Sequence, residues 1–240
     1  PKYGCTHHLI LKELGYNSCN DHQEIVERLE NSEIGWAYAD QSMFNPKLHN
    51  LMSLRKQIIK RPVITTVEVL VKPVSSKNDM FFTGFVHRPY PPIYLELSRN
   101  AQFDSATVIR GTEGGIIPSL RQTGKVHFYH SAGEQDDSYD VTPDDLGIIQ
   151  SSRAVDIPEE ITRKNTKDKI ESKVDAVDIA KETIKSGISA LSGNDGAMLS
   201  CIQLGAAIIL QRATGNDLGN CSKEVLRVLK SGAALKRMKR

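Results

Sequence analysis

The chain has 240 residues, of which 39% are hydrophobic and 25% charged, and its formal net charge is only +2. This composition excludes chain-wide disorder, a collagen-like repeat and a disulfide-stapled scaffold. The length favours one α/β unit with an appendage. We find no apolar run of the roughly 20 residues that span a bilayer and no pattern of a secretion signal, so we expect a soluble protein without a membrane partner.

The small net charge hides three charged blocks. Residues 220–240 hold seven Lys or Arg against one acid, and residues 47–88 hold eight against two, so each block carries +6. Six acids and no base lie within 134–145. Charged blocks are usually solvated faces, but two basic blocks on a near-neutral chain can also steer and neutralise phosphates.

Helix signals dominate the first sixty residues. Thr6 precedes an apolar-periodic run that stops at Gly15, and Asp21 precedes a second run, which predicts two capped helices. Asn45-Pro46 predicts the start of a third helix. Its apolar positions should form a buried stripe of Leu48, Leu51, Met52, Ile58 and Ile59.

Strand and helix patterns then alternate along the chain. A helix is predicted from Pro91 to Ala101, and 63–67 is either a strand or a tight buried turn. Strands alternating with helices favour a largely parallel sheet with helices packed on it. The predicted strands are 34–39, 81–87, 106–110 and 125–130, the segment 133–147 reads as a loop, and the later helices are 171–191, 197–213 and 222–230, broken at Gly193, Gly196, Gly215 and Gly219.

Five short strings occur in one order over most of the chain. They are His8 to Gly15 with Trp36-Ala37-Tyr38-Ala39; Phe44 to Leu48 with Leu54-Arg55; Val108 to Gly115; Thr142-Pro143-Asp144-Asp145-Leu146-Gly147; and Lys230-Ser231-Gly232-Ala233-Ala234. In this order they resemble the C-terminal α/β part of anthranilate phosphoribosyltransferase and its glycosyltransferase-family-3 relatives. Asp40-Gln41 and Phe44 are similar to a divergent subfamily whose bacterial members are described as nucleic-acid-binding proteins.

The resemblance implies a fold and a domain plan. The fold would be α/β, a mainly parallel sheet flanked by helices, as in the C-terminal domain of nucleoside phosphorylases and phosphoribosyltransferases. Residues 1–150 would form the sheet domain, and 151–240 a C-terminal helical segment packing on the same sheet. The family's helical N-terminal domain has no counterpart in these 240 residues.

Departures from the family pattern bear on chemistry. The Gly-Thr-Gly-Gly-Asp phosphate loop is not among these residues, and Lys2-Tyr3-Gly4 is all that matches the Lys-His-Gly-Asn motif. Ile116 and Ile117 stand where the family has adjacent Asp and Glu, and isoleucine offers Mg²⁺ no oxygen. We therefore expect no catalytic residue, no metal site and no cofactor, with Mg²⁺ and phosphoribosyl diphosphate required only if the chain belongs to an active transferase.

Candidate binding residues come from the basic blocks and from one loop. The basic residues that we expect to hold nucleic-acid phosphates are Arg55, Lys56, Lys60, Arg61, Lys236, Arg237, Lys239 and Arg240. A substrate or phosphate loop could be formed by Arg55, Gly111, Glu113 and Gly114, and we expect its turn at the carboxyl end of the parallel strands. His87-Arg88-Pro89-Tyr90 combines positive charge with a stacking ring. The pair His7-His8 beside Cys5 lacks metal-ligand spacing.

Two functions remain open. The first is a phosphoribosyltransferase-like protein that has lost Mg²⁺-dependent transfer and binds nucleic acid through basic surfaces. The alternative is an active anthranilate phosphoribosyltransferase or related glycosyltransferase whose phosphate loop lies upstream of residue 1. Homodimers or larger complexes are further expected partners. Four unpatterned cysteines indicate a reducing compartment, cytoplasmic, or plastid if a transit peptide precedes residue 1.

Overall fold

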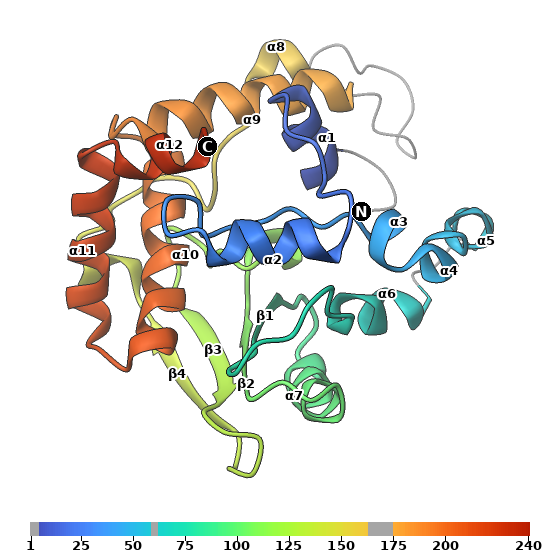
Figure 1. Cartoon of the computed structure of the whole chain (residues 1–240). Coiled ribbons are helices and arrows are strands. Elements are labelled where there is room, and N and C mark those ends of the chain that lie inside the picture. The colour runs from blue at the N-terminus through green and yellow to red at the C-terminus, as the bar shows by residue number, and fades with distance from the viewer. Residues whose placement is uncertain (1–4, 59–61, 163–174) are drawn as a thin grey trace.

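In a computed structural model of the protein, residues 5–58, 62–162 and 175–240 are described. They form a four-stranded sheet covered by helices (Figure 1). The strands lie in the order β1 (Met80–Gly84), β2 (Ser105–Ile109), β3 (Gly124–Tyr129) and β4 (Asp137–Val141). The α/β class with flanking helices is thereby confirmed.

The sheet is mixed rather than largely parallel. Strands β1 and β2 pair in parallel, with Gly84 opposite Ile109, whereas β2–β3 and β3–β4 are antiparallel. The reason lies in the connections. A parallel pair needs a crossover of a dozen or more residues, usually a helix. The segment 85–104 provides one with α7 (Tyr90–Asn100), but 110–123 contains only the short turn η2 (Thr112–Gly114), so the chain turns back as an antiparallel neighbour.

Helices make up most of the remaining chain. The N-terminal ones are α1 (His7–Glu13), α2 (His22–Glu30), α3 (Gln41–Phe44), α4 (Pro46–His49), α5 (Met52–Gln57), α6 (Ile64–Val67) and the 3₁₀ turn η1 (Glu68–Leu70). After the sheet come η3 (Pro143–Leu146), α8 (Glu159–Thr162), α9 (Ala176–Leu191), α10 (Ala197–Thr214), α11 (Leu218–Lys230) and α12 (Ala233–Met238).

Strand β2 divides the core into two clusters because successive side chains point to opposite faces. Ala106 and Val108 join a cluster with Leu95 of α7, whereas Ile109 joins a second with Leu204 of α10. Each side chain is at most 1% exposed. Figure 1 accordingly shows α7 and α10 on different sides of the sheet.

Helix α10 corrects the expectation that no apolar run reaches membrane-spanning length. Its 18 residues have a mean hydropathy of 1.3, enough by length and composition alone to cross a bilayer. In the fold it is a core helix: Leu204, Ala207 and Ile208 are fully buried, and it packs against both α9 and α11. Its apolar character is therefore explained by its burial.

Several predicted elements are right in kind and position. Thr6 and Asp21 cap α1 and α2 through side-chain bonds to Leu9 N–H and Glu24 N–H. Asn45 caps α4, with Pro46 at its first position. The strands predicted at 81–87, 106–110 and 125–130 correspond to β1, β2 and β3, and the helices predicted at 91–101 and 197–213 correspond to α7 and α10.

Other predictions fail because tertiary contacts override local pattern. Segment 34–39 is not a strand. Gly35 has a φ of +66°, which turns the chain, and the Tyr38 carbonyl accepts the Cys19 N–H of the α1–α2 connection rather than pairing with a strand. Segment 133–147 contains the strand β4 rather than only a loop. Only one face of β4 is covered and its acidic residues are exposed, which hid the strand pattern in the sequence. Gly219 lies inside α11 rather than ending a helix.

The stripe predicted after Pro46 is also wrong. The chain breaks into α4 and α5 there, and Leu51, Met52 and Ile58 are 38%, 37% and 39% exposed. Residues 63–67, predicted as a strand or buried turn, form one turn of helix with Val63 78% exposed. Ile59 and residues 171–174 of the predicted helix 171–191 lie outside the described residues; the rest of that helix is α9.

Candidate anion-binding end of the sheet

One end of the sheet gathers most of its connecting loops. Strands β1 and β2 finish there, β3 begins there opposite Ile109, and β4 finishes there with Val141 opposite Gly124. We call this region the loop end. In open α/β sheets the carboxyl ends of parallel strands are where ligands bind, so its side chains are the first candidates for function.

Glycines let the loop after β2 fold tightly over the end of β1. A Cβ at Gly84 or Gly111 would lie closer than 3.0 Å to the Gly115 carbonyl oxygen, a distance that real Cβ atoms essentially never show. Gly114 has a φ of +82°, which favours glycine. The predicted tight turn at the carboxyl end of the parallel pair is confirmed.

Most N–H groups of this turn already donate hydrogen bonds to nearby backbone carbonyls. Gly111 N–H donates to the Ile109 carbonyl, Thr112 N–H to Ile117, Gly114 N–H to Gly111 and Gly115 N–H to Thr112, at 2.9 to 3.3 Å. A phosphate cradle needs such groups to point outward and remain unpaired. Four of the five residues in 111–115 therefore have no N–H left for an anion. The Glu113 side chain is not described.

Helix α7 also begins at this end, and its start offers no free N–H. The first four N–H groups of a helix normally lack an intrahelical partner and can bind anions. Here Pro89 is the N-cap and Pro91 and Pro92 follow, none of which has an N–H, while Tyr90 N–H donates to the His87 carbonyl at 3.0 Å. Backbone anion binding is thus absent at this helix start.

Arginine side chains supply the positive charge instead. Arg88 follows β1, Arg110 follows β2 and Arg121 precedes β3, and all three are exposed. Exposed Arg153 lies beside Arg121, because its carbonyl accepts the Leu120 N–H at 2.9 Å and Arg121 reaches the neighbouring Ser151 carbonyl at 3.4 Å. Within the described residues none of the four makes an ion pair.

Polar and acidic groups border these arginines. Thr123 and Thr142 place their hydroxyls 3.1 Å apart where β3 begins and β4 ends. Exposed Asp144 and Asp145 follow in η3. Sequence patterns missed this grouping because the four arginines are spread over 66 positions without a local cluster; the alternation of strands and turns was the only available signal.

Arg55 is tied up in the fold. Its Nη1 lies 2.5 Å from Glu68 Oε2, and the two side chains are 19% and 17% exposed. Partly buried pairing with Glu68 offsets its charge, so Arg55 is not a free anion ligand in this conformation. Among the described residues no hydrogen bond or ion pair joins Arg55 to Gly111 or Gly114. The Lys56 side chain, Lys60 and Arg61 lie outside what the structure describes.

The basic tail is partly engaged as well. Arg237 donates to the Ser32 carbonyl at 2.9 Å, and Arg240 pairs with Glu33. The Tyr16 hydroxyl bonds to the Met238 carbonyl. Helix α12 is thereby fastened to the turn after α2, leaving Lys236 and Lys239 as exposed cations without ion pairs among the described residues.

His8, unlike a metal ligand, joins a hydrogen-bonded cluster. Its Nδ1 lies 3.0 Å from Asp40 Oδ2 and 2.7 Å from the Tyr38 hydroxyl, which donates to the same carboxylate. Burial raises the pKa of Tyr38, and the Asp40 carboxylate raises it further. Burial alone would raise the pKa of Asp40, but hydrogen bonds from Ser42 and Tyr38 and the charge of His8 outweigh it and lower that pKa.

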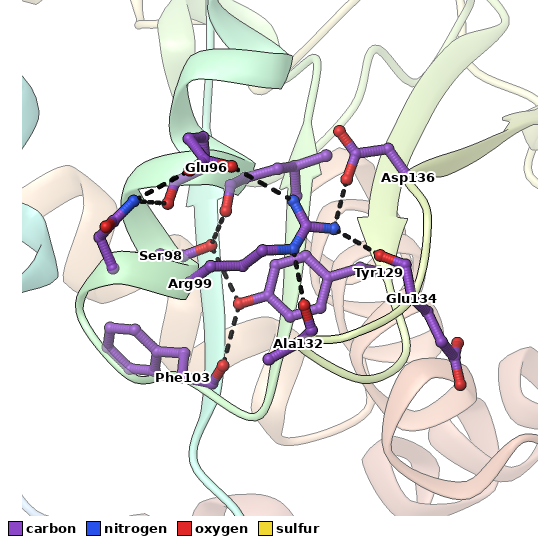
Figure 2. A network of polar contacts seen from close by, with 10 residues as sticks. Glu96, Ser98, Arg99, Phe103, Tyr129, Ala132, Glu134 and Asp136 are labelled. Atoms are coloured by element: carbon purple, nitrogen blue, oxygen red, sulfur yellow. Dashed lines mark hydrogen bonds and ion pairs between the residues drawn. The ribbon is translucent and has the colours of Figure 1, made fainter.

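Arg99 anchors the acidic loop between β3 and β4 (Figure 2). Its guanidinium donates to the carbonyls of Ala132 and Glu134 and to Asp136 Oδ1 at 2.6 to 3.0 Å, and lies 4.2 Å from the centre of the Tyr129 ring. Tyr129 is fully buried, and its hydroxyl donates to the Phe103 carbonyl at 3.0 Å. This arginine is structural.

The two isoleucines at the loop end have different surroundings. Ile117 packs against the second core cluster and would lie 3.2 Å from a Cβ at Gly205 in α10, whereas Ile116 is 37% exposed. No group of three or more His, Cys, Asp or Glu within the described ranges could share an ion. The charged side chains at the loop end are thus four guanidinium groups with the carboxylates of Asp144 and Asp145 beside them.

Comparisons with known proteins agree with this fold. Among solved structures, anthranilate phosphoribosyltransferase from Saccharomyces cerevisiae in complex with PRPP and Mg matches 96% of this chain and 60% of its own, with a TM-score of 0.71 and 14% identity. A second structure of that enzyme covers 98% and 61%, with a TM-score of 0.68 and 16% identity. The chain therefore has the fold of the C-terminal α/β domain of anthranilate phosphoribosyltransferase.

Relatives found by sequence cover less of this chain than the solved structures do. Anthranilate phosphoribosyltransferase from Aquifex aeolicus is 22% identical over 204 residues, which are 85% of this chain and 53% of that protein. An uncharacterised protein from the same organism is 30% identical over 117 residues, 49% of this chain and 32% of that protein. No family model matches. The chain thus spans about a third to three-fifths of the proteins it resembles.

Proposed function

We propose that this chain is a phosphoribosyltransferase-like nucleic-acid-binding unit whose loop end holds the sugar-phosphate backbone. The observation that carries the proposal is the set of four exposed arginines, Arg88, Arg110, Arg121 and Arg153, that make no ion pair among the described residues. Guanidinium groups match phosphate geometry in a fork and keep their charge at any physiological pH. Lys236 and Lys239 could extend the contact.

The kind of donor favours a polymer over a small diphosphate. A diphosphate is held best by converging backbone N–H groups and a metal ion, and the loop after β2 and the start of α7 have used or lost theirs. Arginines on separate loops instead suit phosphates spaced along a strand. Such contacts give affinity and position without reading sequence.

Loss of transfer chemistry is part of the same proposal. Ile117 faces the core where the resembling family has a carboxylate, and Glu113 is the one carboxylate that the sequence has in the loop between β2 and β3. We expect no transfer of ribose phosphate to anthranilate by this protein. Chelator-sensitive turnover above background, measured with purified protein, phosphoribosyl diphosphate and Mg²⁺, would favour the active-transferase alternative.

The decisive experiment neutralises the four arginines together. Each phosphate contact on a single strand adds roughly 0.7 to the slope of log K against log salt, which is about fivefold in affinity at 0.1 M salt relative to 1 M. The variant with Arg88, Arg110, Arg121 and Arg153 changed to Gln should therefore bind a labelled oligonucleotide roughly 600-fold more weakly at 0.1 M salt, with a slope flatter by about 3.

A matched control removes the same net charge elsewhere. Lys12, Lys77, Lys181 and Lys223 are exposed and lie on α1, before β1, on α9 and on α11. Changing all four to Gln should leave most of the affinity and the slope intact. Equal losses of affinity and slope in the two variants would mean that net charge alone explains the binding, and would contradict a site at the loop end.

A further inference from the structure

Three aromatic rings follow one another at the start of α7. The ring centres of His87 and Tyr90 are 6.1 Å apart, and those of Tyr90 and Tyr94 are 5.9 Å apart. The rings of each pair are tilted by 43° and 42°, so neighbours do not stack face to face. We call His87, Tyr90 and Tyr94 the aromatic ladder.

The ladder is half open to solvent. His87 is exposed, whereas Tyr90 and Tyr94 are intermediate in exposure and pack with one side against the first core cluster. Their i, i+4 spacing puts the two tyrosines on one face of α7. Among the described residues no hydrogen bond holds the Tyr90 hydroxyl. The Tyr90 ring is therefore held against the core while part of it stays accessible, and the exposed His87 ring lies next to it.

The ladder adjoins the arginines of the loop end. Arg88 lies between His87 and Tyr90 in sequence, and Phe85 N–H continues the β1–β2 pairing by bonding to the Ile109 carbonyl at 3.0 Å. Val86 packs over Gly114 closely enough to contact a Cβ placed there. The ladder therefore starts beside the turn after β2, and exposed Arg88 lies between His87 and Tyr90 in the chain.

From this juxtaposition we infer that the ligand of the loop end is single-stranded nucleic acid, with its phosphates on the arginines and one or more unpaired bases stacked on His87 and Tyr90. The inference rests on the proposed function and deepens it. Rings beside a basic groove bind single strands because every base has a π face, and in a duplex those faces are hidden within the stack. A duplex would therefore present phosphates to the arginines but no exposed base face to the rings.

The test separates phosphates from bases. Binding of the parent protein is measured by fluorescence anisotropy to a labelled 12-nucleotide single strand and to an abasic strand with the same number of phosphates. One stacked base contributes about 1 to 3 kcal/mol, so the parent should prefer the base-bearing strand by roughly tenfold or more. A duplex of the same sequence should bind as weakly as the abasic strand, per strand.

Four variants locate the preference. His87→Ala and Tyr90→Leu should reduce binding of the base-bearing strand to the abasic level and leave the abasic strand unchanged, and Tyr90→Phe should keep the preference because it keeps the ring. Arg88→Gln should weaken both strands by the same factor. His87→Ala guards against misfolding, since His87 is exposed and precedes the helix.

The outcomes distinguish the two proposals. A parent that binds neither strand contradicts the proposed function itself. A parent that binds base-bearing, abasic and duplex molecules equally retains the proposed function and overturns the single-strand inference. So does a preference that persists undiminished in both His87→Ala and Tyr90→Leu, because the stacking surface would then lie elsewhere.

Discussion

Arginines serve opposite purposes in two regions of this protein. At the loop end Arg88, Arg110, Arg121 and Arg153 are exposed and make no ion pair with a described side chain. At the C-terminal end, Arg237 of α12 and Arg240 just beyond it bond to the turn after α2. The sequence marks the second region as the more basic, yet the structure leaves the first the more available. Charge density along a chain thus does not measure free charge on a surface.

Physical chemistry explains the difference. Docking of α12 brings the Ser32 carbonyl within reach of Arg237 and the Glu33 carboxylate within reach of Arg240, so these bonds help to hold α12 against the turn after α2. The loop-end arginines instead stand exposed on the segments that connect the strands. They can keep their charges unpaired at little cost because water solvates exposed guanidinium groups.

The largest effect should come from the glycine that shapes the loop end. Gly84→Ala places a Cβ against the Gly115 backbone, which cannot move as a flexible side chain could. We expect a loss of about 3 kcal/mol or more in the free energy of unfolding. Urea denaturation measures it, with Gly133→Ala as the control, because a Cβ there meets nothing within 4 Å. Equal stability of Gly84→Ala and the parent would refute the packing.

The next effect should come from a structural arginine. Arg99→Met keeps the stem over Tyr129 but removes three hydrogen bonds to the 132–136 loop. We expect a loss of about 2 kcal/mol, as for hydrogen bonds to charged groups, with no change in oligonucleotide affinity. Denaturation and anisotropy are measured on the same samples. A variant that lost affinity at full stability would place Arg99 among the binding residues.

A smaller loss is expected in the tail. Changing Arg237 and Arg240 together to Gln should cost about 1 kcal/mol or less, because both are exposed and surface pairs are weak. Lys236 and Lys239 changed to Gln should cost nothing measurable in stability. If both tail pairs prove silent in stability and the first pair instead reduces oligonucleotide affinity, α12 is a nucleic-acid arm and not a clasp.

The smallest effect concerns the Asp40 carboxylate, whose charged form the fold stabilises. The pKa of Asp40 is lowered in the folded state, so its carboxylate contributes stability above its ordinary pKa of 3.8, and this contribution is lost as pH falls through the folded value. Asp40→Asn keeps a capping oxygen but cannot titrate. Between about pH 6 and about pH 3 the parent should therefore lose more stability than Asp40→Asn, by roughly 1 kcal/mol or less. Parallel curves would show that Asp40 has an ordinary pKa.

Local signals were enough for the elements whose cause is local. Thr6, Asp21 and Asn45 cap helices because a side-chain oxygen reaches an N–H two or three residues ahead, and that relation is visible in sequence. The residue patterns of β2 and β3 also lie within a few neighbouring positions, so both strands could be predicted from sequence. The glycines of 111–115 predicted a tight turn where the structure has one.

Long-range contacts decided the rest. Residues 34–39 alternate like a strand, but no partner strand lies beside them, whereas β4 looks like an acidic loop and is a strand because β3 pairs with it. Arg55 meets Glu68 and Arg237 meets Ser32 only after folding. The four arginines of the loop end likewise lie at one end of the sheet only when β1, β2, β3 and β4 pair, since proximity across a sheet is a property of strand pairing and not of spacing along the chain.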